Sequence, residues 1–126
     1  MSQIRFTKQH EWARMENGIA VCGITDYAQK ALGDIVYVEL PPAGKKVKSG
    51  EEAAVVESAK AASEVYAPID GEVTAVNDNL SSTPGTVNSD AENNGWFFKL
   101  KPADPAQIDQ LMDEAVYKEY LKELTA

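Results

Sequence analysis

Cysteine and histidine are almost missing from this sequence, and their scarcity excludes whole classes of site. The 126 residues include one cysteine, Cys22, and one histidine, His10. A single cysteine forms no internal disulfide, and one histidine with one cysteine does not complete a metal site. Cys22 lies in an apolar alternation with no evident base, which predicts a small core residue rather than a nucleophile. We expect His10 to be a packed or capping residue.

Long apolar runs and an excess of positive charge are also missing. Residues 1–8 contain no hydrophobic signal region, and no apolar stretch approaches the length of a membrane span. Twenty acidic residues against twelve basic ones give a net charge of −8, a sign that repels nucleic acid and favours brief encounters with basic protein surfaces. We expect no nucleic acid and no membrane as partners. The expected location is a bacterial cytoplasm, or the mitochondrial matrix for a mature eukaryotic form.

The length fits a single domain, residues 1–126, whose core is expected to span about residues 4–101. Short runs rich in β-branched and aromatic residues alternate with turn signals, a pattern typical of strands. Strands are predicted at 19–24, 35–40, 51–58, 62–67, 72–76 and 96–100. A short helix is predicted between two of them, with Asp26 as N-cap, Gln29 at its third position and Gly33 as its stop. The polar segment 77–85 is expected to hold one helical turn.

The pattern changes to helix near residue 104. Asp104 is the expected N-cap, Pro105 the first helical residue, and Gln107 the partner that completes a capping box. A second helix is predicted to start at Asp113. Its apolar stripe consists of Val116, Tyr117, Tyr120, Leu121 and Leu124. We expect these helices, about residues 104–124, to pack on the β-core as a tail.

Two short segments echo each other. Residues 42–47 and 68–73 each contain a proline, then a glycine, then a valine. The echo predicts two similar halves wrapped around each other.

Between the two halves lies a segment bounded by Gly50 and Gly71, whose midpoint falls beside Lys60. If this segment folds as a hairpin, its turn is Ala59-Lys60-Ala61, with the amine at the apex and only small side chains beside it. A hairpin apex is accessible to other proteins. A lysine in a surface turn commonly serves solubility, and the residues up to this point leave that interpretation open.

The residues from Val55 to Pro68 closely resemble the lipoyl-lysine hairpin of the glycine cleavage system H protein family. The resemblance covers most of the chain. It continues through residues 10–12, 21–33, 33–41, 71–77, 87–88 and 95–96. It implies a mainly β fold, the barrel-sandwich hybrid of lipoyl and biotinyl carriers, with two antiparallel sheets, short helices and a C-terminal helical tail. Biotin carriers flank their lysine with methionines, which Ala59 and Ala61 are not.

By this resemblance the chain is a carrier and not an enzyme, with lipoate in amide linkage on Lys60. The family takes the aminomethyl group of glycine from a pyridoxal-phosphate decarboxylase and delivers it to a tetrahydrofolate-dependent aminomethyltransferase. Dihydrolipoyl dehydrogenase then reoxidises the dithiol. Glu57, Glu64 and Gly71 match positions important for recognition by the lipoate-attaching enzyme, a lipoate ligase or octanoyltransferase.

The resemblance also implies a cleft that shelters the loaded arm. Its polar groups match Glu11 and Glu64, with Gln9 close by, and its apolar wall matches Ile24 and Leu32. Two carboxylates shielded from water would hold a protonated amine by charge-assisted hydrogen bonds. The simpler interpretation of Glu11 is a surface strand residue.

Two other functions stay open on the sequence. A relay protein that holds lipoate or octanoate for transfer to other enzymes would share the same hairpin. An unmodified interaction module would share the fold, although the presence of Lys60, Glu57 and Gly71 speaks against it. An independent enzyme fits least well, because no acid, base and nucleophile converge in the sequence.

Overall fold

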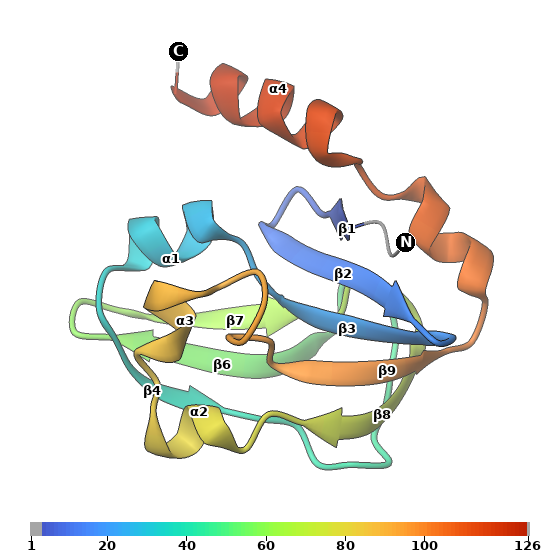
Figure 1. Cartoon of the computed structure of the whole chain (residues 1–126), viewed down its shortest axis with the longest axis horizontal. Coiled ribbons are helices and arrows are strands. Elements are labelled where there is room, and N and C mark those ends of the chain that lie inside the picture. Colours follow the sequence, from blue (N-terminus) through green and yellow to red (C-terminus); the bar gives the residue numbers. More distant parts are fainter. Residues whose placement is uncertain (1–3, 126) are drawn as a thin grey trace.

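The fold consists of two antiparallel β-sheets packed face to face, with short helices at their margins and a longer C-terminal helix (Figure 1). The computed structural model describes residues 4–125. Among these residues the larger sheet has the order β1-β2-β3-β9-β8-β5, and the smaller sheet has the order β4-β6-β7. All neighbouring strands run antiparallel.

Most elements lie where the sequence predicts them. The strands are β1 (Ile4–Phe6), β2 (Glu11–Glu16), β3 (Ile19–Ile24), β4 (Ile35–Glu39), β5 (Lys46–Val47), β6 (Glu52–Ser58), β7 (Ala62–Tyr66), β8 (Gly71–Val76) and β9 (Phe98–Pro102). The helices are α1 (Asp26–Leu32), α2 (Asn79–Ser82), α3 (Thr86–Ser89), the 3₁₀ helix η1 (Pro105–Gln110) and α4 (Glu114–Thr125). Elements β1, β5 and α3 are not predicted from the sequence, and of β2 only Glu11 is placed in a strand. Within the described residues, no helix has the length and apolar character needed to cross a bilayer.

The core lies between the two sheets and is built from apolar residues that alternate along the strands. Phe98 and Leu100 of β9 are fully buried and pair with Cys22 and Ala20 of β3. The prediction that Cys22 is a small core residue is confirmed, because its side chain is 1% exposed. Burial raises the pKa of this thiol, so Cys22 stays protonated and unreactive.

A second cluster attaches the C-terminal helix to the edge of the larger sheet. The ring of Tyr117 stacks on Phe6 with centroids 4.4 Å apart. Its hydroxyl lies 2.8 Å from Thr25 Oγ1 and 2.8 Å from His10 Nδ1. Burial raises the pKa of Tyr117 to about 12 and lowers that of His10. His10 is therefore the packed residue that the sequence predicts.

The predicted apolar stripe of α4 is wrong at two of its five positions. Tyr117 is buried, and Tyr120 and Leu121 are partly buried against the second cluster. Val116 and Leu124, however, are 52% and 47% exposed. The reason is that α4 contacts the short strand β1 and then extends beyond the edge of the sheet (Figure 1).

The predicted cap of the first helix also needs correction. The N-cap of α1 is Thr25, whose hydroxyl accepts a hydrogen bond from Ala28 N–H, and not Asp26. Asp26 lies one residue further on and accepts a bond from the side chain of Gln29. That bond, together with nearby Lys30, lowers the pKa of Asp26. Gly33 ends the helix as predicted, with a positive φ of 87°.

The predicted N-cap of the C-terminal helical segment, Asp104, is confirmed, but its expected partner in a capping box is not. Asp104 accepts a hydrogen bond from Ala106 N–H and starts the element, which is a 3₁₀ helix. Gln107 does not complete a capping box. Its side-chain oxygen instead accepts a bond from Asp70 N–H at 2.8 Å, which ties η1 to the turn before β8.

The two echoing segments lie beside each other. Strand β5 pairs with the start of β8 through Lys46 with Glu72 and Val47 with Gly71. Backbone bonds between the segments 42–47 and 68–73 extend this pairing toward Gly44. The two echoing segments are therefore hydrogen-bonded neighbours in the larger sheet, and the wrapping of two similar halves stays a prediction.

Candidate functional site

The candidate site is the turn between β6 and β7, which projects at one end of the smaller sheet (Figure 1). Strand β6 ends at Ser58 and β7 begins at Ala62, so the turn is Ala59-Lys60-Ala61, as predicted. All three turn residues are exposed. Within residues 4–125, no carboxylate forms an ion pair with the Lys60 amine.

The backbone of this turn is held in place by the hydroxyl of Ser58, a residue that the sequence interpretation missed. Its Oγ accepts hydrogen bonds from Lys60 N–H at 3.2 Å and from Ala61 N–H at 3.1 Å, and donates to the Ala61 carbonyl. Ser58 is 8% exposed, so water does not compete for these bonds. A serine two residues before a turn lysine is a signal for this motif. The result is an ordered turn that carries an exposed amine.

A second support comes from the loop after α1. The Asp34 carbonyl accepts a hydrogen bond from Ala59 N–H at 3.1 Å. Asn88 of α3 positions that loop, because its side chain donates to the Gly33 carbonyl and accepts from Ile35 N–H, each at 2.9 Å. The stem of Lys60 passes over Gly33, where an added Cβ would lie 3.8 Å from Lys60 Cε. The turn is therefore supported by α1 and α3 as well as by its own strands.

Two of the three predicted recognition residues lie on one face of the smaller sheet. Strand register places Glu57 between Tyr37 of β4 and Ala62 of β7. It places Glu64 beside Val55 of β6. Alternation along the strands directs these side chains away from the core. Glu57 and Glu64 therefore occupy the same outer surface, next to the Lys60 turn.

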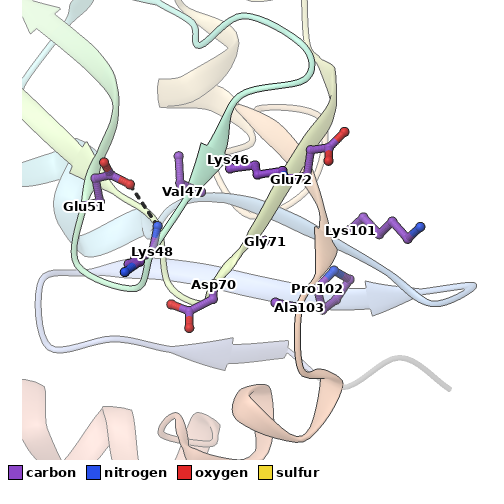
Figure 2. A pocket seen from close by; sticks show the side chains of 10 residues that line it. All are labelled: Lys46, Val47, Lys48, Glu51, Asp70, Gly71, Glu72, Lys101, Pro102 and Ala103. Carbon is purple, nitrogen blue, oxygen red and sulfur yellow. Dashed lines mark hydrogen bonds between the residues drawn. The ribbon is translucent and has the colours of Figure 1, made fainter.

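The third predicted recognition residue, Gly71, lies elsewhere. It begins β8 in the larger sheet and lines a cavity of about 790 Å³ (Figure 2), whose lining contains no residue of the Lys60 turn. The charged residues that line this cavity are Lys46, Lys48, Lys101, Glu51, Asp70 and Glu72. A Cβ on Gly71 would lie 2.6 Å from the Lys101 carbonyl oxygen, closer than real Cβ atoms approach. Gly71 thus allows β8 and β9 to approach each other.

Glu11 is buried, and its interpretation as a surface strand residue is wrong. It is 3% exposed at the start of β2. One carboxylate oxygen accepts a bond from Thr7 Oγ1 at 2.6 Å, and the other accepts from Tyr66 N–H at 3.3 Å. Burial nevertheless raises the pKa of Glu11, outweighing the two hydrogen bonds. A cation brought against this carboxylate would favour its ionised form and lower its pKa.

The structure brings together only part of the predicted cleft. Gln9, Glu11 and Tyr66 all line a cavity of about 300 Å³. Glu64, Ile24 and Leu32 are not in the lining of this cavity. Ile24 pairs with Glu11 across the strands but points into the core. Among the described residues, no cluster of His, Cys, Asp or Glu could hold a metal ion.

Comparison with known proteins identifies the family of this chain. The family model described as glycine cleavage H-protein matches residues 4–124. This chain belongs to the glycine cleavage H-protein family. It is 59% identical to the glycine cleavage system H protein of Parvibaculum lavamentivorans over 124 residues, covering 98% of this chain and 99% of that protein. It is 58% identical to the protein of the same name from Beijerinckia indica, covering 98% of this chain and all of that protein.

A solved structure shows the same fold. The crystal structure of a glycine cleavage system H protein from Mycobacterium marinum matches with a TM-score of 0.87 and 31% identity, over 95% of this chain and 97% of that chain. The expected barrel-sandwich hybrid of two antiparallel sheets is confirmed. As an H protein, the chain is the lipoyl carrier component of the glycine cleavage system and has no catalytic activity of its own.

The raised pKa of Glu11 makes the stability of this H protein depend on pH. As the pH falls through the raised pKa of folded Glu11 and below the ordinary carboxyl value of 4.5, we expect wild type to gain stability relative to Glu11→Gln. The folded pKa lies above the unfolded one, so ionised Glu11 disfavours folding at high pH, and this cost disappears below the unfolded pKa. The gain is about 1.4 kcal/mol for each unit between the two pKa values. Urea unfolding of both proteins across this pH range measures it.

Glutamine is a suitable replacement because it can keep both contacts. Its amide oxygen can accept from Tyr66 N–H while its NH₂ donates to Thr7 Oγ1. The difference between the two proteins then reports ionisation and not lost packing. Parallel stability curves for the two proteins over the whole range would show that Glu11 titrates normally.

Proposed function

We propose that Lys60 carries lipoate in amide linkage and that the loaded protein moves the aminomethyl group of glycine between enzymes of the glycine cleavage system. The single observation that carries this proposal is the exposed Lys60 amine on a turn ordered by Ser58. An extended acyl chain fits this position, because Ala59 and Ala61 place no bulky side chain beside the amine.

Attachment needs a neutral amine and an activated acyl donor. The nitrogen of Lys60 attacks the carbonyl of a lipoyl or octanoyl mixed anhydride or thioester. An amide C–N bond forms, the bond to the leaving group breaks, and the amine gives up its proton to a base of the attaching enzyme. The chain contributes an accessible nucleophile on an ordered backbone, which reduces the entropy lost on docking.

When bound, the lipoyl group supplies a strained disulfide that accepts the aminomethyl group and is later restored by oxidation of the dithiol. The chain's own residues provide the ordered turn to which the moving arm is attached. A tether replaces repeated capture from solution by local search at a raised effective concentration. A freely moving attachment turn would lower this effective concentration. The hydrogen bonds from Ser58 and Asp34 restrain the turn.

We propose three working partners: the pyridoxal-phosphate glycine decarboxylase, the tetrahydrofolate-dependent aminomethyltransferase and dihydrolipoyl dehydrogenase. A lipoate ligase or octanoyltransferase is the fourth, as the attaching enzyme. The net charge of −8 favours brief encounters with basic surfaces, as a carrier that visits several enzymes requires. Because the relatives described above come from bacteria, we propose a bacterial cytoplasm as the location.

We propose that Glu11 and Gln9 receive the cationic amine of the cargo between enzymes. The buried carboxylate of Glu11 can hold an ammonium group by a charge-assisted hydrogen bond. Gln9 lines the same cavity and can accept a second bond. Glu64, Ile24 and Leu32 lie outside this lining. We therefore propose only Glu11 and Gln9 as contacts for the amine. Glu57 and Glu64 are instead proposed as contacts for the attaching enzyme.

Mass spectrometry of the protein isolated from its native cells tests the function directly. We expect an intact mass increased by one lipoyl group, mapped by peptide fragmentation to Lys60. The modified protein should then support decarboxylation of glycine and formation of methylenetetrahydrofolate with the three partner enzymes. An intact mass with no lipoyl increment after coexpression with a lipoate ligase would point to an unmodified interaction module. Transfer of the arm to 2-oxoacid dehydrogenase domains without glycine cleavage would point to a relay protein.

A further inference from the structure

Two consecutive bulky apolar side chains are exposed on β4, close to the Lys60 turn. Val36 is 57% exposed and Tyr37 is 50% exposed. In a regular strand, neighbouring side chains point to opposite faces, so one of the two would enter the core. A shift in register between Ile35 and Tyr37 inserts an extra residue on β4 at this point. This bulge turns both side chains outward, while Ile35 and Val38 on either side stay buried.

These two residues extend the surface that already holds the predicted recognition residues. Tyr37 lies directly opposite Glu57, and Ile35 lies opposite Ser58, the residue that orders the turn. In the next row across the three strands, Val55 of β6 lies between Glu39 of β4 and Glu64 of β7. We call this surface the outer face. It consists of Val36, Tyr37, Glu39, Val55, Glu57 and Glu64.

The outer face combines two exposed apolar residues on its edge strand, β4, with acidic neighbours. Three of its six residues are glutamates and none is basic. An exposed tyrosine on a rigid strand beside charged residues is a typical anchor of a protein interface. The matching partner surface is an apolar pocket with lysine or arginine at its rim. Burial of Val36 and Tyr37 in such a pocket would remove two large apolar groups from water.

We propose that the outer face docks the enzyme that attaches lipoate to Lys60. This inference rests on the proposed function. In acyl transfer the reacting atoms must approach to about 3–3.5 Å before the bond forms. No arm exists at that stage, so the attaching enzyme must cover the turn and the strands beside it. The later partners meet the far end of a long arm and need no contact with β4.

The test compares lipoylation of two double variants with wild type. In Val36→Ser/Tyr37→Ser the two exposed apolar side chains of β4 are removed. In Val116→Ser/Leu124→Ser two similarly exposed side chains are replaced on α4, which contacts β1 of the larger sheet (Figure 1). With a lipoate ligase, ATP and lipoate, the intact mass followed over time gives kcat/KM. We expect kcat/KM of the first variant to fall by about tenfold or more, since two apolar contacts with the enzyme are lost. A tenfold fall corresponds to about 1.4 kcal/mol of binding free energy. The second should match wild type.

Thermal unfolding of both variants shows that the loss does not come from misfolding, since exposed substitutions change stability little. Glu39→Lys provides a second, independent variant that reverses a charge at the rim and should raise KM most at low salt. Equal lipoylation of wild type, the β4 double variant and Glu39→Lys would overturn the proposal. So would normal lipoylation with slowed glycine decarboxylation, which would assign the face to a later partner. Failure of wild type itself to be lipoylated would overturn the proposed function and this inference with it.

Discussion

Lys60→Arg is expected to give a folded protein that takes up no lipoate and supports no glycine cleavage. Arginine keeps the positive charge and a stem of similar length at an exposed position, so the fold should be unaffected. Its guanidinium stays protonated at any accessible pH and cannot attack an acyl carbonyl. Intact mass after incubation with lipoate ligase, ATP and lipoate should show no increment, and decarboxylation of glycine in the reconstituted system should fall to background.

Lys48→Arg is the matched control for this experiment. Lys48 is exposed and lies in a turn before the hairpin, at the cavity that contains Gly71 and not at the Lys60 turn. The control should be lipoylated and active at the wild-type level. If Lys60→Arg still supported glycine cleavage, lipoate would have to be attached at another residue. That result would remove the basis of the proposed function.

Gly71→Ala is expected to lower the free energy of unfolding by about 1–3 kcal/mol, with a fall of several degrees in Tm. The added Cβ would lie 2.6 Å from the Lys101 carbonyl oxygen and 3.3 Å from Leu100 Cβ. The first contact is with backbone, which cannot move aside as the end of a flexible side chain would. Strands β8 and β9 must therefore separate slightly at the position where they begin to pair. Urea and thermal unfolding measure the change.

Gly85→Ala is the control, because its backbone φ is −62° and nothing lies within 4 Å of the added Cβ. Alanine there should leave stability unchanged or raise it by about 0.4–1 kcal/mol. Lipoylation then separates a role in the fold from direct recognition. Below its Tm, Gly71→Ala should be lipoylated within about twofold of wild type, since Gly71 is remote from the turn. A stable Gly71→Ala protein that is lipoylated far more slowly would instead show direct recognition of this glycine.

The two classes of predicted recognition residue differ in how a substitution acts. Glu57 and Glu64 lie on the outer face, so a change there alters what a partner meets and leaves the core intact. Gly71 lies between two strands, so a change there alters the strands themselves. Stability measurements combined with lipoylation rates distinguish these cases where activity alone would not.

The sequence by itself determined the hairpin and its lysine. Glycines on both sides of a symmetric segment predict the turn at residues 59–61, and the structure places it there. The strand at 19–24, the stop of α1 at Gly33 and the cap at Asp104 were also predictable. These features depend on local chemistry: the conformational freedom of glycine, the hydrogen bonds of capping side chains and the alternation of apolar residues.

Some local signals were ambiguous until the chain folded. Thr25 and Asp26 are both good N-cap residues, and the chain uses the threonine because its hydroxyl reaches both Ala28 N–H and the buried Tyr117 hydroxyl. Gln107 matches a capping box, but the turn before β8 brings Asp70 N–H close enough to take its side chain. In both cases the competing partner lies far away along the sequence.

Only the tertiary structure decided which polar residues are buried and which apolar ones are exposed. Glu11 is expected on the surface from the sequence, yet the fold buries it, and this burial raises its pKa. Val36 and Tyr37 lie in the predicted strand 35–40, where alternation would place one of them in the core, yet a bulge turns both outward. Gly71 resembles a recognition position, yet a carbonyl 30 residues away leaves no room for a side chain. Burial and close approach depend on which strands become neighbours, and strand pairing is a property of the whole chain.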